Sequence, residues 1–241
     1  MIYACSDIHG QYDKFLELLK KIKFSDNDQM YVLGDVIDRG PAPLPLLLYI
    51  LASPDITLLA GNHEHMMIKA YETGDNELWL YNGAKITLRQ FGRLSGTSQK
   101  SLIERLKSLP LVIPDLKVGK RHFYLTHAGL YDIKLDEALT YHDVDEDTVN
   151  NLVWSRDLAN GCKACDIVSP DVYDRYKGHY VLLGHTRTSN CAFGTSTGMR
   201  NAHIAFGSHG HVINLDCGAV SKGNIGCLRL DDNKEFYVPC R

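Results

Sequence analysis

The stretch Tyr31-Val-Leu-Gly-Asp-Val-Ile-Asp-Arg-Gly40 begins with three apolar residues and continues with two carboxylates and a guanidinium. An apolar run this short, ending at Gly34, predicts a buried strand. Asp35, Asp38 and Arg39 would then lie just beyond the carboxyl end of that strand, where α/β sheets bind their ligands. Charged groups at such a place cost free energy unless they are paired or bind a metal. Taken alone, the stretch is equally consistent with a polar turn that contains one ion pair.

A short apolar run followed directly by histidine, asparagine or acidic residues occurs four more times along the chain. A lone histidine or aspartate after a strand is more often a core residue or a helix cap, but five such coincidences are implausible. Imidazole and carboxylate groups that meet at one edge suit a divalent metal site, and so many nitrogen and oxygen ligands predict two ions that share a carboxylate. The four further segments are Asp7 and His9 after 2–5, Asn62, His63 and Glu64 after 56–59, His127 after 122–126, and His185 after 180–183.

Composition limits the partners and the compartment. The net charge of -3 and the lack of a basic run give no indication of nucleic acid or of an anionic membrane as a partner. No apolar stretch approaches the roughly 20 residues that span a bilayer. Residues 1–5 run directly into Asp7, which leaves no room for an export signal. We therefore expect a cytoplasmic protein whose 7 cysteines are reduced thiols.

Periodicity predicts the elements between these strands. No linker and no internal repeat interrupts the pattern, so we expect one domain over residues 1–241. The segment 158–177 is polar and irregular and gives no assignment. Helices are expected at 11–22, 44–51, after 64 to about 71, 77–91 and 100–109, more weakly at 135–139 and 148–154, a hairpin at 111–126, and closing strands at 211–215, 225–230 and 235–238.

At these residues the chain resembles the calcineurin-like metallophosphoesterases, and within them the phosphoprotein phosphatase (serine/threonine phosphatase) branch in its small bacterial and phage form. The resemblance implies an α/β (α+β) fold in which two mixed β-sheets pack as a central sandwich flanked by helices. One departure is Ser6, where the family often has glycine, and a small side chain should preserve the close approach of the backbone. The ordered motifs are Asp7-Ile-His9-Gly10, Gly34-Asp35-Val-Ile-Asp38-Arg39-Gly40, Gly61-Asn62-His63-Glu64, His127-Ala-Gly129 and Gly184-His185-Thr186.

The resemblance also implies a role for each site residue. His63 would be the general acid, and Asp38 would orient it and keep it protonated. Arg39 would clamp the phosphate, with Asn62 and Arg156 as further phosphate contacts, which for Arg156 is favoured over the alternative of a surface residue after a helix. The expected cofactors are two divalent ions, most directly Mn²⁺ with Fe or Zn as alternatives, which activate a hydroxide. Their expected ligands, with Asp35 shared by both ions, are Asp7, His9, Asp35, Asn62, His127 and His185.

Residues and resemblance together predict a phosphomonoester hydrolase, specifically a serine/threonine protein phosphatase that acts on a phosphorylated protein or peptide. A symmetrical dinucleoside tetraphosphate hydrolase is the alternative enzyme, but those relatives tend to lack an acid at the position of Asp38. A phosphopeptide-binding module without activity would require lost ligands, and none is lost. Cys162 and Cys165 are expected to be free surface thiols because no second pair completes a zinc site. Trp79 is expected in the core or at the rim of the substrate site, and the sequence gives no indication of the oligomeric state.

Overall fold

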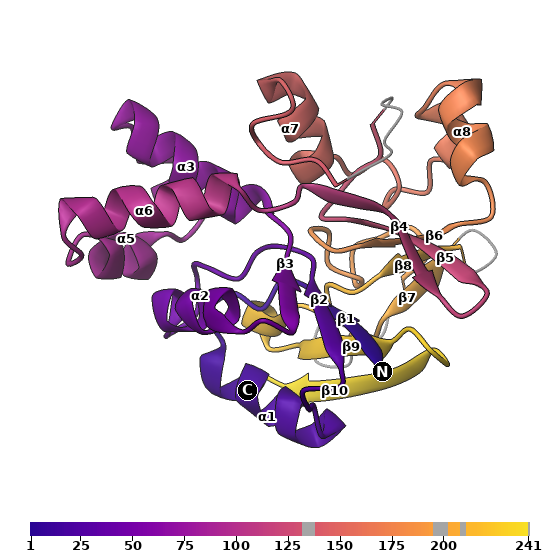
Figure 1. Ribbon diagram of the computed structural model, residues 1–241, viewed down its shortest axis with the longest axis horizontal. Coiled ribbons are helices and arrows are strands. Elements are labelled where there is room, and N and C mark those ends of the chain that lie inside the picture. The colour runs from indigo at the N-terminus through magenta and orange to yellow at the C-terminus, as the bar shows by residue number, and fades with distance from the viewer. Residues whose placement is uncertain (132–137, 195–201, 208–210, 241) are drawn as a thin grey trace.

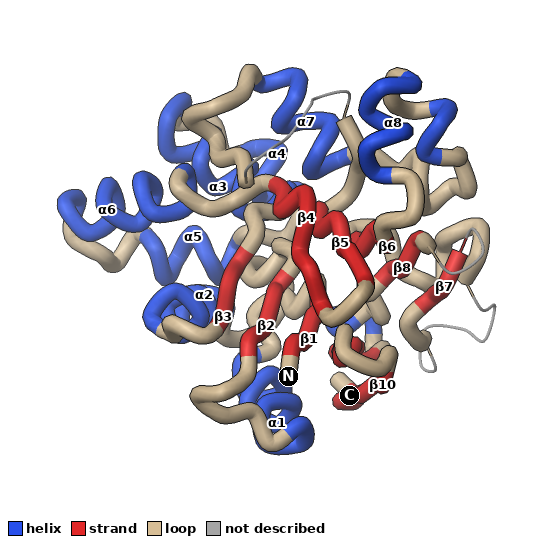
Figure 2. The backbone as a smooth tube through the Cα atoms, turned by 45° about the vertical axis from the view of Figure 1, so that its right-hand side comes forward, coloured by secondary structure: helices blue, strands red, loops and turns tan. Residues whose placement is uncertain are grey.

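The protein was analysed as a computed structural model, which describes residues 1–131, 138–194, 202–207 and 211–240. Its ten strands form two mixed five-stranded sheets (Figures 1 and 2), as the sequence predicts. The first sheet has the order β10-β9-β1-β2-β3, in which β1, β2 and β3 are parallel. Its strands are β1 (Ile2–Cys5), β2 (Gln29–Val32), β3 (Ile56–Leu58), β9 (Asn224–Arg229) and β10 (Lys234–Pro239).

The second sheet has the order β4-β5-β6-β8-β7, in which β5, β6 and β8 are parallel. The two sheets face each other through an apolar layer to which Ala4 and Leu33 contribute from one side and Phe123 and Leu182 from the other. Parallel strands place their carboxyl ends at the same edge of a sheet, so each sheet presents three such ends. The strands are β4 (Val112–Val118), β5 (Arg121–Thr126), β6 (Tyr180–Leu183), β7 (Ala205–Gly207) and β8 (Val212–Asn214).

Helices flank both sheets (Figure 1). Helix α1 (Tyr12–Ile22) packs on β9 and β10, and α2 (Pro43–Ala52) packs on β3. Helix α3 (Asn62–Thr73) contacts both α4 (Glu77–Tyr81) and α6 (Gly96–Lys107), and α5 (Lys85–Phe91) contacts α2. Helices α7 (Glu146–Trp154) and α8 (Pro170–Tyr176) lie beside the second sheet. Two 3₁₀ turns, at Ala164–Asp166 and Ala219–Ser221, complete the described elements.

The structure differs from the sequence-based expectations at several places. The helix expected over 77–91 is two helices, because the chain turns at Gly83, whose φ is +100°. Helix α8 lies within the unassigned segment 158–177, and the short strand β7 was not predicted. Most of the helix expected at 135–139 lies outside the described residues. None of the helices in the described part of the chain is both long and apolar enough to cross a bilayer.

Candidate metal and phosphate site

Six parallel strands deliver polar side chains to one edge of the sandwich. The loop after β8 belongs to this set as well, and its Asp216 was not assigned a role from the sequence. The run 212–214 followed by Asp216 repeats the pattern of the other five, so the signal was present in the sequence. The side chains are Asp7 and His9 after β1, Asp35 after β2, Asn62 after β3, His127 after β5, His185 after β6 and Asp216 after β8.

The backbone of these loops is strained in a way that turns the side chains inward. Nine described non-glycine residues have φ in the left-handed region, and six of them belong to the site. Such conformations cost free energy and persist only where the surrounding structure enforces them. The loops enforce one another here, since the amide of His9 donates to the carbonyl of Asp35 at 2.9 Å. The six residues are Asp7, His9, Asp35, Asp38, Arg39 and His185.

The buried carboxylate of Glu64 fastens the loop after β2 to the start of α3. It accepts hydrogen bonds from the amides of Asp35 at 2.9 Å and Val36 at 3.0 Å, and also from those of Ile37 and Gly61. Sequence reasoning placed Glu64 in a motif but gave it no role. The available signal was its spacing, because an acid three residues after the residue that precedes a helix, here Gly61, can cap the start of that helix.

Hydrogen bonds fix the protonation of two imidazoles. Nδ1 of His9 lies 2.9 Å from the carbonyl oxygen of Ile37, and Nδ1 of His127 lies 2.6 Å from that of Leu33. A carbonyl only accepts, so in each neutral ring Nδ1 carries the proton and Nε2 is a bare acceptor. Nε2 of His127 nevertheless faces two more acceptors, Oδ1 of Asn62 at 3.0 Å in one direction and an oxygen of Asp35 at 3.5 Å in another.

Acceptors that converge without a proton between them fit a cation. Two groups in the site offer ligand atoms within 4.8 Å of one another, and Asp35 belongs to both. One comprises His9, Asp35 and His63, and the other comprises Asp35, His127 and His185. Among the described residues, the buried Nε2 atoms of His63 and His185 have no hydrogen-bond partner, which is costly unless a ligand supplies one. These residues therefore fit divalent metal ions, of which the sequence predicts two.

The remaining two expected ligands lie beside these groups. Oδ1 of Asn62 lies 2.9 Å from Nδ1 of His185, so the amide oxygen faces both His127 and His185. The carboxylate of Asp7 accepts a hydrogen bond from the amide of His185 at 3.0 Å and another from the hydroxyl of Ser6. Burial is the main reason that the pKa values of the Asp7 and Asp35 carboxyls lie well above their ordinary range. A bound cation would reverse that cost.

A histidine–aspartate pair lies next to these ligands. Nδ1 of His63 is 2.6 Å from Oδ2 of Asp38, and both side chains are fully buried. Burial raises the pKa of Asp38 to about 7 and lowers that of His63, so the pair shares a proton along this contact. Two more groups hold Asp38, since the Trp79 indole donates to Oδ2 at 2.7 Å and the Thr87 hydroxyl donates to Oδ1 at 2.5 Å. Trp79 is therefore a buried partner of the site, and sequence reasoning missed Thr87 altogether.

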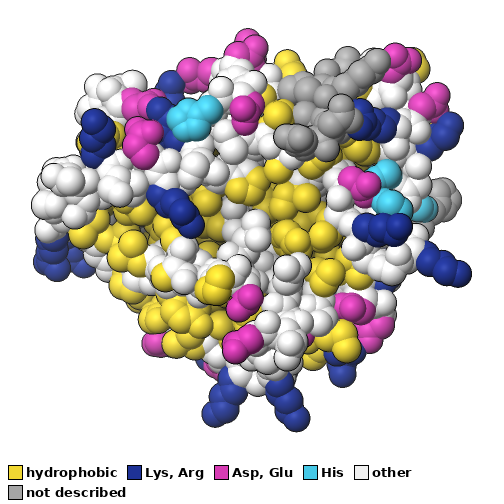
Figure 3. All heavy atoms as spheres, viewed as in Figure 1, with side chains coloured by type: hydrophobic (Ala, Val, Ile, Leu, Met, Phe, Trp, Pro, Cys, Tyr) yellow, Lys and Arg dark blue, Asp and Glu magenta, His cyan; other side chains and the backbone are white. Residues whose placement is uncertain are grey.

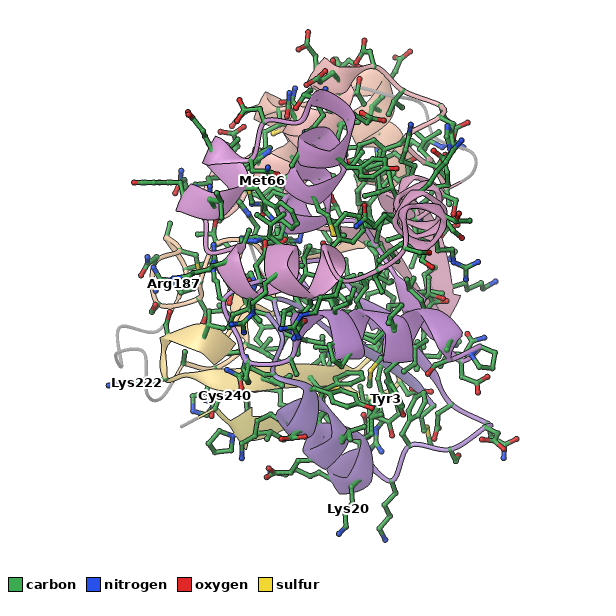
Figure 4. All side chains as sticks on the ribbon, turned by 90° about the vertical axis from the view of Figure 1, so that its left-hand side faces the viewer. Tyr3, Lys20, Met66, Arg187, Lys222 and Cys240 are labelled. Atoms are coloured by element: carbon green, nitrogen blue, oxygen red, sulfur yellow. The ribbon has the colours of Figure 1, made fainter. Side chains whose placement is uncertain are left out.

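Three arginines line the cleft that leads to this edge, which has a volume of about 570 Å³. Nη1 of Arg39 lies 2.8 Å from Nε2 of His9, and Arg156 donates to the hydroxyl of Thr186 at 2.8 Å. The third, Arg187, was not predicted, although it stands only two residues after His185. It donates to the hydroxyl of Ser221 at 2.8 Å and lies at the margin of the molecule on the same side as Lys222 (Figure 4). Guanidinium groups around a cleft suit a phosphate dianion.

Other residues considered from the sequence lie elsewhere. Cys162 and Cys165 are exposed and free, as expected. His211 lies with its ring stacked on Tyr180, near the opposite end of β6 from His185. The Trp154 ring, in contrast, meets the His185 ring edge to face, with ring centroids 5.8 Å apart. Trp154, two residues before Arg156, therefore packs against the site.

Comparison with known proteins agrees with this geometry. The sequence profile of the calcineurin-like phosphoesterase family matches residues 1–189. The chain is 33% identical over 190 residues to a serine/threonine-protein phosphatase 2 of Salmonella typhimurium, which is 78% of this chain and 82% of that relative. It is 38% identical over 143 residues to a symmetrical bis(5'-nucleosyl)-tetraphosphatase of Nitrosococcus oceani, 57% of this chain and 48% of that one. A protein-tyrosine phosphatase from a psychrophilic Shewanella shares the fold, with a TM-score of 0.64 at 21% identity over 98% of this chain and 80% of that chain.

Proposed function

The chain belongs to the calcineurin-like phosphoesterase family, and on that premise we propose that it is a metal-dependent protein phosphatase acting on phosphoserine and phosphothreonine. The observation that carries this proposal is the buried contact of 2.6 Å between His63 and Asp38. An alkoxide leaves phosphorus readily only if an acid protonates it, and a histidine held by a carboxylate can do so. Phosphoserine and phosphothreonine have such poor leaving groups.

The metal ions would be held by side chains from the ends of five strands. Asp35 would be the ligand common to both ions, because it belongs to both groups of close ligand atoms. When bound, divalent ions supply positive charge for the phosphate and lower the pKa of water. We propose Mn²⁺ for both positions, since the ligand set contains nitrogen and oxygen without thiolate. The full set would be Asp7, His9, Asp35, Asn62, His127 and His185.

The chain's own residues would bind the phosphate and move the proton. Arg39 and Arg156 would hold phosphate oxygens from two sides of the cleft, and the amide of Asn62 would add a donor. The Nε2 atom of His63 has no hydrogen-bond partner in the part of the chain that the structure describes, so it is free to hold a proton toward the leaving oxygen. A phosphate dianion near that nitrogen favours the charged imidazole, which burial alone disfavours. Asp38 would keep the ring oriented through Nδ1.

A second candidate activity is symmetrical hydrolysis of dinucleoside tetraphosphates. The relative from Nitrosococcus oceani supports it, and a cleft with three arginines could accommodate several phosphates. Nucleotide leaving groups need less protonation than an alkoxide does, so an acid pair would be less important for that reaction. The buried Asp38, held by Trp79 and Thr87, therefore favours the phosphomonoester substrate.

A side-by-side assay tests the proposal. The Mn²⁺-loaded protein is expected to have a higher kcat/KM for phosphoserine peptides than for diadenosine tetraphosphate. The variant Asp38→Ala should lose far more activity on the peptide than on the dinucleotide, which leaves through a better group. A wild-type preference for the dinucleotide, with little effect of Asp38→Ala on either substrate, would assign the chain to the second activity instead.

A further inference from the structure

A third group of close metal-ligating atoms lies outside the proposed active site. Asp115 in β4, His122 in β5 and His179 just before β6 each offer one atom, and these atoms lie within 4.8 Å of one another. Nδ1 of His122 is 2.7 Å from Oδ1 of Asp115, and Nε2 of His179 is 3.5 Å from the same oxygen. Of the three such groups found among the described residues, this one shares no member with the other two.

Sheet register brings the three residues together. Lys117 in β4 pairs with His122 in β5, and the register of this pair shifts between Ile113 and Leu116. Asp115 lies within that irregular stretch, and its carboxylate reaches His122 across the hairpin. In the parallel pair of β5 and β6, Phe123 is opposite Tyr180. The residues that precede this pair are His122 and His179, which therefore lie side by side, with ring centroids 5.3 Å apart. Neighbouring strands thus bring His179 to Asp115 and His122, although His179 is far from both in sequence.

The location separates this cluster from the active site. His122 stands near the start of β5, whereas His127 follows the end of the same strand. Five residues of extended chain span about 16 Å, so the two sites lie at opposite ends of the strand. The side chains of His122 and Asp115 are 39% and 52% exposed, and a dissolved ion can reach them. Histidine, acidic and basic side chains adjoin at the right of the surface in Figure 3, over the region where Figure 1 draws β4 to β6.

The donor chemistry and spacing suit a transition-metal ion. Two imidazoles and one carboxylate are a common protein ligand set for Zn²⁺ and similar ions, with water completing the coordination. Bond lengths of about 2.0–2.2 Å in a tetrahedron place ligand atoms roughly 3.3 Å apart. The separation of 3.5 Å between His179 and Asp115 is close to that value. The separation of 2.7 Å between His122 and Asp115 is a hydrogen bond, whose proton the ion would replace.

We propose that Asp115, His122 and His179 form a peripheral binding site for one divalent ion of the zinc type. The ion would link the β4–β5 hairpin to the turn that joins α8 to β6. Besides the pairing of β5 with β6, the turn meets that hairpin through His179, whose Nε2 lies 3.5 Å from Oδ1 of Asp115. The site does not depend on the catalytic function proposed above, because none of its ligands belongs to the active site.

Zinc content measured by equilibrium dialysis tests this site. The full-length protein is dialysed against micromolar zinc chloride, and bound zinc is determined by elemental analysis. The wild type is expected to hold one more equivalent than the double variant His122→Gln/His179→Gln. The matched control is His142→Gln, which removes an exposed histidine in a different loop and should bind as the wild type does. Ions held at the active-site edge contribute equally to all three proteins.

A second measurement covers the case in which the double variant fails to fold. Zinc added to the wild-type protein should shift the imidazole NMR signals of His122 and His179, and Asp115→Asn should weaken that response about tenfold. Equal zinc content in the wild type and a folded double variant would overturn the proposal. The proposal would also be overturned if the imidazole signals of His122 and His179 stayed unchanged during the titration. Loss of the additional zinc equivalent in His142→Gln would overturn it as well.

Discussion

Nδ1 of His63 lies 2.6 Å from Oδ2 of Asp38, and no other contact in the proposed site joins an acid and an imidazole so closely among the described residues. Asp38 comes from the loop after β2, and His63 comes from the first turn of α3. Helices α4 and α5 complete the arrangement, since Trp79 and Thr87 both donate to the same carboxylate. The pair therefore depends on four separate segments of the chain.

The first prediction concerns the leaving group. His63→Ala should lower kcat on phosphoserine peptides by about 10²–10⁴, the usual contribution of a general acid. The loss on 4-nitrophenyl phosphate should be much smaller, because its leaving group departs without a proton. Steady-state kinetics on both substrates, with bound metal measured for each protein, provides the check. Equal losses on the two substrates would contradict an acid role for His63.

The second prediction concerns Thr87. Its hydroxyl donates to Oδ1 of Asp38 and accepts from the Asp38 amide at 3.1 Å, so Thr87→Val removes two bonds at nearly constant volume. The hydroxyl lowers the pKa of Asp38, and its loss should therefore raise that pKa above about 7. We expect the pH profile of kcat to shift upward and stability to fall by about 1–3 kcal/mol. Thr87→Ser should restore the profile, and a profile that is unchanged in Thr87→Val would refute the positioning role.

The third prediction concerns Glu64. Each of its carboxylate oxygens accepts two backbone amides, and Glu64→Gln replaces one oxygen by a donor that faces amides. Two buried amides lose their acceptor, which should cost about 3 kcal/mol of unfolding free energy in urea titrations. Glu72→Gln is the matched control, because Glu72 forms only an exposed ion pair with Lys107. That variant should lose less than about 1 kcal/mol, and similar losses in both would show that Glu64 does not fasten the loops.

The fourth prediction concerns pH and His65. Burial lowers the pKa of this ring to about 4, and the ring nitrogen Nδ1 contacts the hydroxyl of Tyr141. As the pH falls from about 6.5 to about 4, the unfolded chain binds a proton that the folded protein does not, so stability decreases over this window by up to about 3 kcal/mol. Urea unfolding of His65→Gln should show a shallower pH dependence than the wild type. The control variant His142→Gln should retain the wild-type dependence of unfolding free energy on pH. If His65→Gln also retained it, the pKa of His65 would not be lowered in the folded protein.

The fifth prediction concerns Arg187. Its place in the cleft beside Arg39 and Arg156 suggests a contact with the substrate. Arg187→Met should raise KM for phosphopeptides about tenfold, the equivalent of one charge-assisted hydrogen bond, and leave kcat nearly unchanged. Arg93→Met, which removes an exposed arginine from the loop before α6, should change neither constant. An unchanged KM in Arg187→Met would show that this arginine does not contact the substrate.

The sequence by itself determined the strand ends and the polar residues that follow them. A short apolar run and the polar residue after it are adjacent in the chain, so Asp7, Asp35 and His127 could be recognised without knowing how the strands pair. The same rule applied to Asp216 would have extended the set to a sixth strand. The fold class followed from these local patterns together with the family resemblance.

Only the tertiary structure decided which distant groups meet. Trp79 and Thr87 reach Asp38 because two helices pack beside the loop after β2, and nothing in their own surroundings in the sequence indicates that contact. His122 and His179 become neighbours through the parallel register of β5 and β6, which is set by the pairing of whole strands. Local patterns depend on residues that are adjacent in the chain. These contacts depend instead on how the apolar faces are buried over the entire sandwich, because the packing of whole strands and helices determines where each polar side chain lies.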